Sequence, residues 1–227
     1  MRLVIASLVV IGCTHEEEPP APAFELLGPD VTLGGMDLDH AGADWARWAL
    51  EQPVPHNPVL DETGADCAEG QTDGVFYLAG TFGDAPVSRA CTATSSGPFL
   101  MPLYNVFYDN CGTPTEDQVS DEVLRSTVDD LLDEIDHLQL TVDGEDVFSS
   151  VADAEAWRTR VTAYSWENPE TDGLYDSWGY PVTGTCDPSY AAGYYAPLRF
   201  EPGEHALSLV AGTPDFEVTV DYALTVP

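Results

Sequence analysis

Alternation of apolar and polar residues is clearest near the end of the chain. Over residues 216–226 every second residue is apolar, which is typical of an antiparallel strand buried on one face. Similar short strand-like segments occupy residues 138–142, 157–166, 194–200 and 205–210. The pair Asp143-Gly144 follows the first of these segments and predicts a hairpin turn. The second half is therefore expected to be an antiparallel β-sandwich, with residues 167–193 as long loops.

Continuous apolar runs replace this alternation in the first half. Residues 74–82 and 99–108 are almost entirely apolar or aromatic, which predicts strands buried on both faces. Pro102 is compatible with the second run only at an edge or a bulge. Residues 87–92 predict a further strand between them.

Two helices are predicted from three- and four-residue spacing. Trp45 and Trp48 share one face of a helix near 43–52, either as core anchors or as a sugar-stacking platform. Apolar residues recur at helical spacing from Val119 to Ile135 and predict an amphipathic helix near 116–136, with a capping box that starts at Thr115. The expected class is thus α+β, mostly β. Residues 36–227 form the expected folded domain, with 36–136 and 137–227 as candidate sub-units.

The chain begins with one arginine, a short apolar run and a small residue before a cysteine, Val10-Ile11-Gly12-Cys13. The apolar run has roughly half of the ~20 residues that a spanning helix needs, and its plan is that of a secretory signal. The tetrad resembles the lipobox of bacterial lipoproteins. This resemblance implies a signal peptide at 1–12 and a lipid on Cys13. It also implies attachment to the cell envelope, at the outer membrane or cell surface rather than the inner membrane.

Charge limits the choice of partners. The 227 residues include 40 acidic and seven basic residues, and all seven basic residues are arginines. Such a surface repels nucleic acid, so no nucleic-acid partner is expected. The acidity is consistent with adaptation to salt or with cation binding. Residues 13–35 are acidic and proline-rich at their start, and we expect them to form an extended tether.

Four cysteines remain after Cys13, and an even number in an exported chain predicts two disulfides. A hairpin made from residues 74–82 and 87–92 returns Cys91 to the level of Cys67. The expected pairs are therefore Cys67–Cys91 and Cys111–Cys186.

Motifs for known catalytic chemistry are absent from the sequence. There is no Gly-x-Ser-x-Gly, no His-Glu-x-x-His and no glycine-rich phosphate loop. Acidic loops that begin at Asp37 and Asn168 start like calcium loops but lack the full ligand set. No cofactor is expected, with calcium as the one alternative.

A set of short motifs spans most of the chain after residue 44. The motifs are Trp45-x-x-Trp48, Asn57-Pro58-x-x-Asp61-x-Thr63-Gly64-x-x-Cys67-x-x-Gly70-Gln71, Phe76-x-Leu78-Ala79-Gly80-Thr81-Phe82-Gly83, Arg89-x-Cys91-Thr92, Pro102-x-x-Asn105 and Pro202-Gly203-x-His205. Together they resemble a group of uncharacterised secreted bacterial proteins, which implies a fold and export but no activity. The chain departs from that pattern at 93–98, where a proline-glycine-lysine turn is missing.

Five polar residues within these motifs are the candidate binding residues: Asp61, Thr63, Gln71, Arg89 and Asn105. In the alternative, Asp61 and Thr63 only set a turn and Arg89 pairs with a carboxylate. A second candidate surface is aromatic, suited to sugars or to the protein core: Tyr175, Trp178, Tyr180, Tyr190, Tyr194 and Tyr195. The expected role is a binding or structural module for carbohydrate or an envelope protein. A glycosidase-like hydrolase and a calcium-dependent adhesion module are the alternatives.

Overall fold

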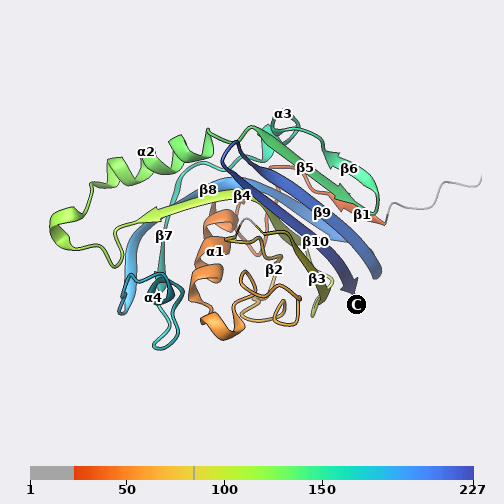
Figure 1. The fold of residues 1–227 in the computed structure, drawn as a ribbon. Coiled ribbons are helices and arrows are strands. Elements are labelled where there is room, and N and C mark those ends of the chain that lie inside the picture. Colours follow the sequence, from red (N-terminus) through yellow and green to blue (C-terminus); the bar gives the residue numbers. More distant parts are fainter. Residues whose placement is uncertain (1–22, 84) are drawn as a thin grey trace, which may run out of the picture.

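The computed structural model describes residues 23–83 and 85–227, which form two mixed β-sheets with helices packed around them (Figure 1). The predicted α+β, mostly-β class is confirmed. The predicted signal peptide, the lipobox at Val10–Cys13 and the first part of the tether lie outside the described residues. The strands are β1 (Phe24–Leu26), β2 (Phe76–Tyr77), β3 (Val87–Thr92), β4 (Phe99–Asp109), β5 (His137–Val142), β6 (Glu145–Phe148), β7 (Thr162–Glu167), β8 (Thr185–Phe200), β9 (Gly203–Thr213) and β10 (Phe216–Val226). The α-helices are α1 (Leu38–Glu51), α2 (Asp121–Leu132), α3 (Val151–Ala154) and α4 (Leu174–Ser177).

The first sheet is built around the long strands β4 and β8. Its order is β1-β8-β4-β2, and β7 pairs with the start of β8. β4 and β8 are antiparallel, and their register shifts between Pro102 and Tyr104. β2 is parallel to β4 and pairs only with Phe99 and Leu100. The Leu78 amide donates to the Leu100 carbonyl at 3.0 Å, and the chain leaves the sheet after this bond.

The second sheet has the order β3-β10-β9-β5-β6. β9 and β10 form a long antiparallel hairpin, and β10 is parallel to β3 on its other side. The predicted Asp143-Gly144 turn joins β5 to β6, with positive φ angles of 53° and 81° at the two residues. Each sheet contains strands from both halves of the chain. The two candidate sub-units, 36–136 and 137–227, are therefore not separate, because non-local pairing joins β3 to β10 and β4 to β8.

Helices α1 and α2 cover opposite faces of the first sheet (Figure 1). The hydroxyl of Tyr195 on β8 donates to the Gly42 carbonyl of α1 at 3.1 Å. Arg125 of α2 stacks on Tyr190 of β8, with 4.3 Å between its guanidinium carbon and the ring centroid. Residues 190 and 195 are an odd number of positions apart, so their side chains point to opposite faces of the strand. The second sheet packs on the same side as α2 and forms the main core with it.

Both predicted helices exist, with different boundaries. α1 begins at Leu38 rather than near 43, because the Asp37 carboxylate accepts a hydrogen bond from the His40 amide at 3.0 Å and caps the helix there. α2 is shorter than predicted, because its cap is Ser120 and not a capping box at Thr115. Residues 115–117 form a separate 3-10 turn.

Two predicted loop regions contain strands. Phe24–Leu26 pairs with Leu198–Phe200, so the tether predicted over 13–35 is too long and the fold includes residues 24–35. Residues 185–193, predicted as loop, form the first part of β8. Residues 189–193 within it are buried on both faces of the strand and therefore show no alternation of apolar and polar residues. In contrast, the buried run at 74–82 contributes only the two residues of β2 to the sheet.

Both predicted disulfides are confirmed, with Cα–Cα distances of 5.8 Å for Cys67–Cys91 and 5.9 Å for Cys111–Cys186. The hairpin expected to align Cys67 with Cys91 is wrong, because β2 and β3 belong to different sheets. Two disulfides indicate an oxidising environment outside the cytoplasm. None of the helices within residues 23–83 and 85–227 has the length and apolar composition needed to cross a bilayer.

Candidate functional site

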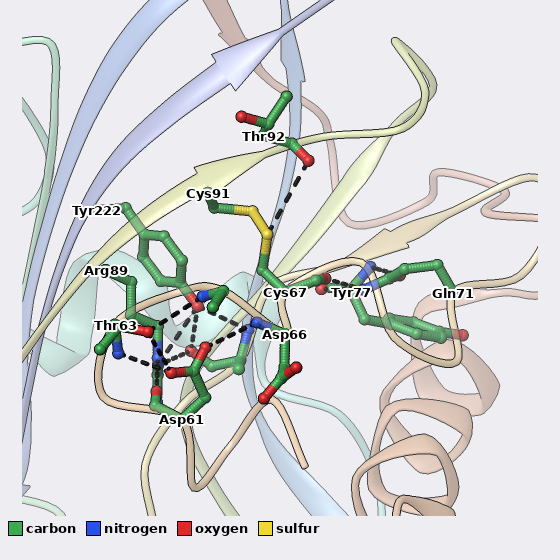
Figure 2. Close-up of a disulfide and its surroundings, with 12 residues drawn as sticks. Asp61, Thr63, Asp66, Cys67, Gln71, Tyr77, Arg89, Cys91, Thr92 and Tyr222 are labelled. Atoms are coloured by element: carbon green, nitrogen blue, oxygen red, sulfur yellow. Dashed lines mark hydrogen bonds between the residues drawn. A yellow bond between two sulfur atoms is a disulfide. The ribbon is translucent and has the colours of Figure 1, made fainter. Parts of the chain in front are cut away.

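Three of the five candidate binding residues meet beside the Cys67–Cys91 disulfide (Figure 2). Asp61 and Thr63 lie in the loop before β2, and Arg89 lies on β3. The Asp61 carboxylate accepts hydrogen bonds from the Thr63 amide and hydroxyl at 2.8 and 2.7 Å, and from the Asp66 amide at 2.9 Å. Burial disfavours the charged carboxylate, but these bonds outweigh burial and hold the pKa of Asp61 below its ordinary value. Asp61 therefore fixes the shape of its own loop, as in the turn alternative.

Arg89 is 2 % exposed and lies beneath this loop. Its guanidinium donates to the carbonyl oxygens of Val59, Asp61, Ala79 and Gly80 at 2.6–3.1 Å. It also donates to the Tyr222 hydroxyl at 3.3 Å. The contacts of Arg89 are thus with backbone carbonyls and a tyrosine, where the turn alternative expected a carboxylate. The guanidinium N–H groups that make these bonds therefore point into the protein and not toward solvent.

Gln71 has a similar structural role on the other side of the loop. Its side-chain amide donates to the carbonyls of Cys67 and Tyr77, both at 2.9 Å, and accepts from the Tyr77 amide at 2.8 Å. Four of the five candidates therefore tie the loop at 57–72 to β2, β3 and β10. The hydrogen bonds described for them are made within the protein.

Asn105, the fifth candidate, lies elsewhere, in a groove of about 240 Å³ beside β4. The groove runs between β4, the segment that follows β2 and the start of β10. We call it the β4-edge groove. It is lined by Trp45, Gly80, Thr81, Phe82, Pro102, Leu103, Tyr104, Asn105, Val106, Phe107, Phe216 and Val218.

The lining places the groove along the edge of β4. Side chains of a strand alternate between its two faces, so a pocket on one face is lined by every second residue. Here six consecutive residues, 102–107, contribute to the lining. The groove therefore follows the side of the strand, and part of its wall is main chain.

Aromatic rings border the groove and continue beyond it. Phe82 contacts Phe107 edge-on, with ring centroids 5.9 Å apart, and also contacts Trp178, with ring centroids 5.4 Å apart. Trp178 is 42 % exposed and Tyr180 is 53 % exposed. The other members of the predicted aromatic surface, Tyr175, Tyr190, Tyr194 and Tyr195, are buried in the core instead. Only the Trp178 end of that surface is therefore available to a ligand.

The groove contains no charged side chain, whereas the chain as a whole carries a formal net charge of −33. Acidic residues lie near one end of it. Phe216 also lines an adjoining depression, which contains Asp136, Asp215, Glu217 and the ring of His137, which pairs with Asp136 at 2.6 Å and with Glu217 at 3.3 Å. The groove is thus a neutral, mostly apolar site that ends at an acidic rim.

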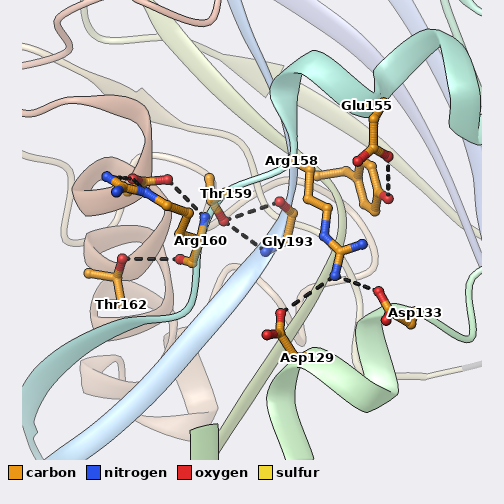
Figure 3. Close-up of polar contacts among 10 residues, drawn as sticks. Asp129, Asp133, Glu155, Arg158, Thr159, Arg160, Thr162 and Gly193 are labelled. Atoms are coloured by element: carbon orange, nitrogen blue, oxygen red, sulfur yellow. Dashed lines mark hydrogen bonds and ion pairs between the residues drawn. The ribbon is translucent and has the colours of Figure 1, made fainter. Parts of the chain in front are cut away.

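A second cleft between α2 and residues 155–161 contains both arginines and carboxylates (Figure 3). Arg158 binds Asp129 on α2 and Asp133 directly after it. Burial lowers the pKa of Arg158, but its interactions with Asp133 and Tyr194 outweigh burial and hold that pKa above the ordinary value. Glu155 accepts a hydrogen bond from the Tyr194 hydroxyl at 3.1 Å. Arg160 points away from Arg158 toward α1, where it pairs with Asp39. These arginines and acidic residues already bind partners within the protein. Their contacts link residues 155–161 to α1, α2 and the first sheet.

Metal ligands are grouped at one place within the described ranges, at Asp109, Cys111 and Cys186. The two sulfur atoms form a disulfide and are not free to bind a metal. The Asp109 carboxylate accepts hydrogen bonds from Tyr175 and Ser189 at 3.0 and 2.9 Å. Asp37 and Asp39, from the loop that resembles the start of a calcium site, cap α1 and bind Arg160.

Comparison with known protein families, curated proteins and solved structures found no match. The resemblance to secreted bacterial proteins therefore stays a prediction, and the β4-edge groove is the candidate site on its geometry alone. Most of its lining was not predicted, because it is assembled from α1, β4 and β10. Six lining residues do stand in the sequence motifs: Trp45, Gly80, Thr81, Phe82, Pro102 and Asn105. Pro102 also restricts the apolar run at 99–108 to an edge or a bulge.

Proposed function

We propose that this chain is a bacterial lipoprotein whose folded domain binds a component of the cell envelope in the β4-edge groove. The observation that supports this best is a neutral, aromatic-lined groove on a protein that is otherwise strongly acidic. Apolar grooves with a few polar groups are the usual form of ligand sites. Since no carboxylate lines this groove, it favours binding over the glycosidase-like alternative, which needs a pair of them.

Lipid on Cys13 would hold the domain on the membrane, with the two disulfides stabilising it outside the cytoplasm. Cys13→Ser tests this part. We expect the variant to lose incorporation of labelled palmitate and to keep its signal peptide. Palmitate labelling of Cys13→Ser, or a mature N-terminus at another residue, would contradict the lipoprotein assignment.

Groove binding is tested with the lipidated full-length protein in detergent, probed with an array of cell-wall glycans and with a random nonapeptide phage library. Phe107→Ala removes part of the aromatic wall and should abolish binding of whichever ligands are found. The matched control is Tyr108→Ala, the next residue on β4, which is 41 % exposed and does not line the groove. Ligands that bind Phe107→Ala as well as they bind the unmodified protein would show that the groove is not the site.

A further inference from the structure

β4 is paired on both sides only over its first residues. β8 follows one side of it from Phe99 to Asp109, whereas β2 pairs on the other side with Phe99 and Leu100 alone. Beyond Pro102, no strand within residues 23–83 and 85–227 pairs with this outer side. Unpaired strand edges offer a row of N–H and C=O groups that another extended chain can bind.

The direction of the backbone N–H and C=O groups of β4 follows from the hydrogen bonds on the edge of β8 that faces away from β4. Gly193 pairs with Asn105, but its amide donates to the Thr159 hydroxyl at 2.9 Å and its carbonyl accepts from the Thr159 amide at 2.8 Å. Gly193 thus directs both backbone groups away from β4. In an antiparallel pair the opposite residue does the same, so the N–H and C=O of Asn105 face the groove. The backbone N–H and C=O of Phe107, two residues further along β4, also face the groove.

The start of β10, which forms the opposite wall of the groove, also has an unpaired strand edge within the described residues. β3 pairs with β10 only from Val220 onward. Phe216 and Val218 come before this point and line the groove from the side facing β4. The groove is therefore a gap between two strand edges with an apolar floor that includes Trp45 and Gly80.

A ligand that fits this gap needs main-chain donors and acceptors, an apolar group and a positive charge. The unpaired edge of β4 requires main-chain donors and acceptors, and the aromatic lining requires an apolar group. The acidic rim contains Asp136, Asp215 and Glu217, of which Asp136 and Glu217 already pair with His137. Asp215 and the formal net charge of −33 of the whole chain therefore favour a basic residue at that end. An extended polypeptide supplies all three, because alternate side chains can enter the groove while its backbone pairs with β4.

We propose that the β4-edge groove binds an extended polypeptide segment by strand addition to β4, with an apolar side chain in the groove and a basic residue at the acidic rim. This rests on the proposed function, since it names the class of component that the groove binds. The partner is thus a protein of the envelope and not a glycan.

The test uses nonapeptides enriched from the phage library on the full-length protein and then synthesised. Each peptide is made with N-methyl groups on its odd-numbered or on its even-numbered residues. Strand addition uses every second peptide amide, so one series should bind at least tenfold more weakly and the other should change little. Equal effects of the two series would overturn strand addition, whereas loss of binding in Phe107→Ala would still support the groove.

A pair of protein variants tests the same point from β4. Asn105→Pro removes the amide that faces the groove, and prolines are accepted where a strand N–H points away from the sheet. Asn105→Ala keeps that amide and loses only the side chain. We expect Asn105→Pro to weaken peptide binding several-fold more than Asn105→Ala, while Tyr108→Ala leaves it unchanged. Near-ultraviolet circular dichroism checks that each variant is folded.

The two proposals fail in different ways. If glycans bind and depend on Phe107 while no peptide is enriched, the polypeptide inference is wrong and the groove remains the binding site. If neither class depends on Phe107, both proposals are wrong.

Discussion

Arg89 has a buried positive charge that backbone carbonyls from two parts of the chain surround. These carbonyls belong to the loop at 57–61 and to the segment after β2, and Tyr222 adds a contact from β10. Hydrogen bonds from a charged donor are stronger than those from a neutral one. Arg89 therefore holds together segments that no sheet joins.

Replacing Arg89 with methionine should lower the free energy of unfolding by roughly 3 kcal/mol, since it leaves several buried carbonyls without a donor. Urea denaturation monitored by tryptophan fluorescence measures this. The matched control is Arg199→Met, because Arg199 is an exposed partner of Glu25 and its loss should change stability by about 0.5 kcal/mol or less. Similar losses in both variants would show that the carbonyl contacts of Arg89 contribute little.

Buried tyrosines determine the response to alkali. Burial raises the pKa of Tyr77, Tyr175 and Tyr195 well above the ordinary value of about 10, and acidic neighbours raise it further at Tyr77 and Tyr175. A raised pKa in the folded state means that the stabilisation is complete below about pH 10 and is lost as the pH rises above it. We expect the free energy of unfolding to fall steeply between about pH 10 and 12.

Absorbance of tyrosinate against pH, recorded together with circular dichroism, measures this. The buried tyrosines should ionise only as the fold is lost. If all tyrosines ionise while the circular dichroism spectrum stays native, burial does not protect them.

At the scale of elements, the start of α2 gives a direct choice between two caps. The Ser120 hydroxyl accepts a hydrogen bond from the Val123 amide at 3.4 Å, whereas Thr115 lies in a separate turn. Ser120→Ala should therefore cost about 1 kcal/mol of stability, and Thr115→Ala should cost far less. Thermal or urea denaturation of both variants decides between them. A larger loss in Thr115→Ala would restore the capping box that the sequence predicts.

The elements that the sequence predicts well are those with local signals. Periodicity finds α1 and α2, and a continuous apolar run finds β4. Residues 189–193 of β8 have no such signal, because both faces of the strand are buried there and their glycine and tyrosine content suggests a loop.

The same distinction applies to the site. Asp61 and Arg89 have recognisable spacing near a cysteine, yet their partners show that they stabilise a loop. The groove around Asn105 depends on where β2 leaves β4 and where β3 leaves β10. Both are long-range pairings that a single sequence does not specify. Of the five candidate residues, Asn105 alone lies in the groove. It was selected as a polar residue within a motif, whereas its place in the groove follows from these long-range pairings.

For the whole molecule, the dominant property is repulsion among acidic groups. The chain has 40 acidic residues and seven arginines. In the described part, Arg47, Arg158, Arg160 and Arg199 already pair with carboxylates, so most acidic groups have no cationic partner. At ~0.15 M ionic strength the screening length is ~8 Å, and at ~1 M it falls to ~3 Å.

We therefore expect the melting temperature to rise by several degrees between ~0.15 and ~1 M sodium chloride. Differential scanning fluorimetry measures the shift. Sucrose at equal osmolarity is the control, because it acts without screening charge. A rise of the same size in sucrose, or none in salt, would mean that the acidic groups are spaced harmlessly.

The parallel pairing of β3 with β10 also bears on when the molecule can fold. β3 enters its sheet only by pairing with the last strand described, so Val87 and Cys91 have no neighbouring strand until β10 has been synthesised. Closing contacts between such distant segments is slow, because the intervening chain must first be ordered. A ribosome or a translocation channel would thus release the chain through β10 before its second sheet could close. For a chain that crosses a membrane unfolded, strand order itself delays folding of the second sheet until β10 has crossed.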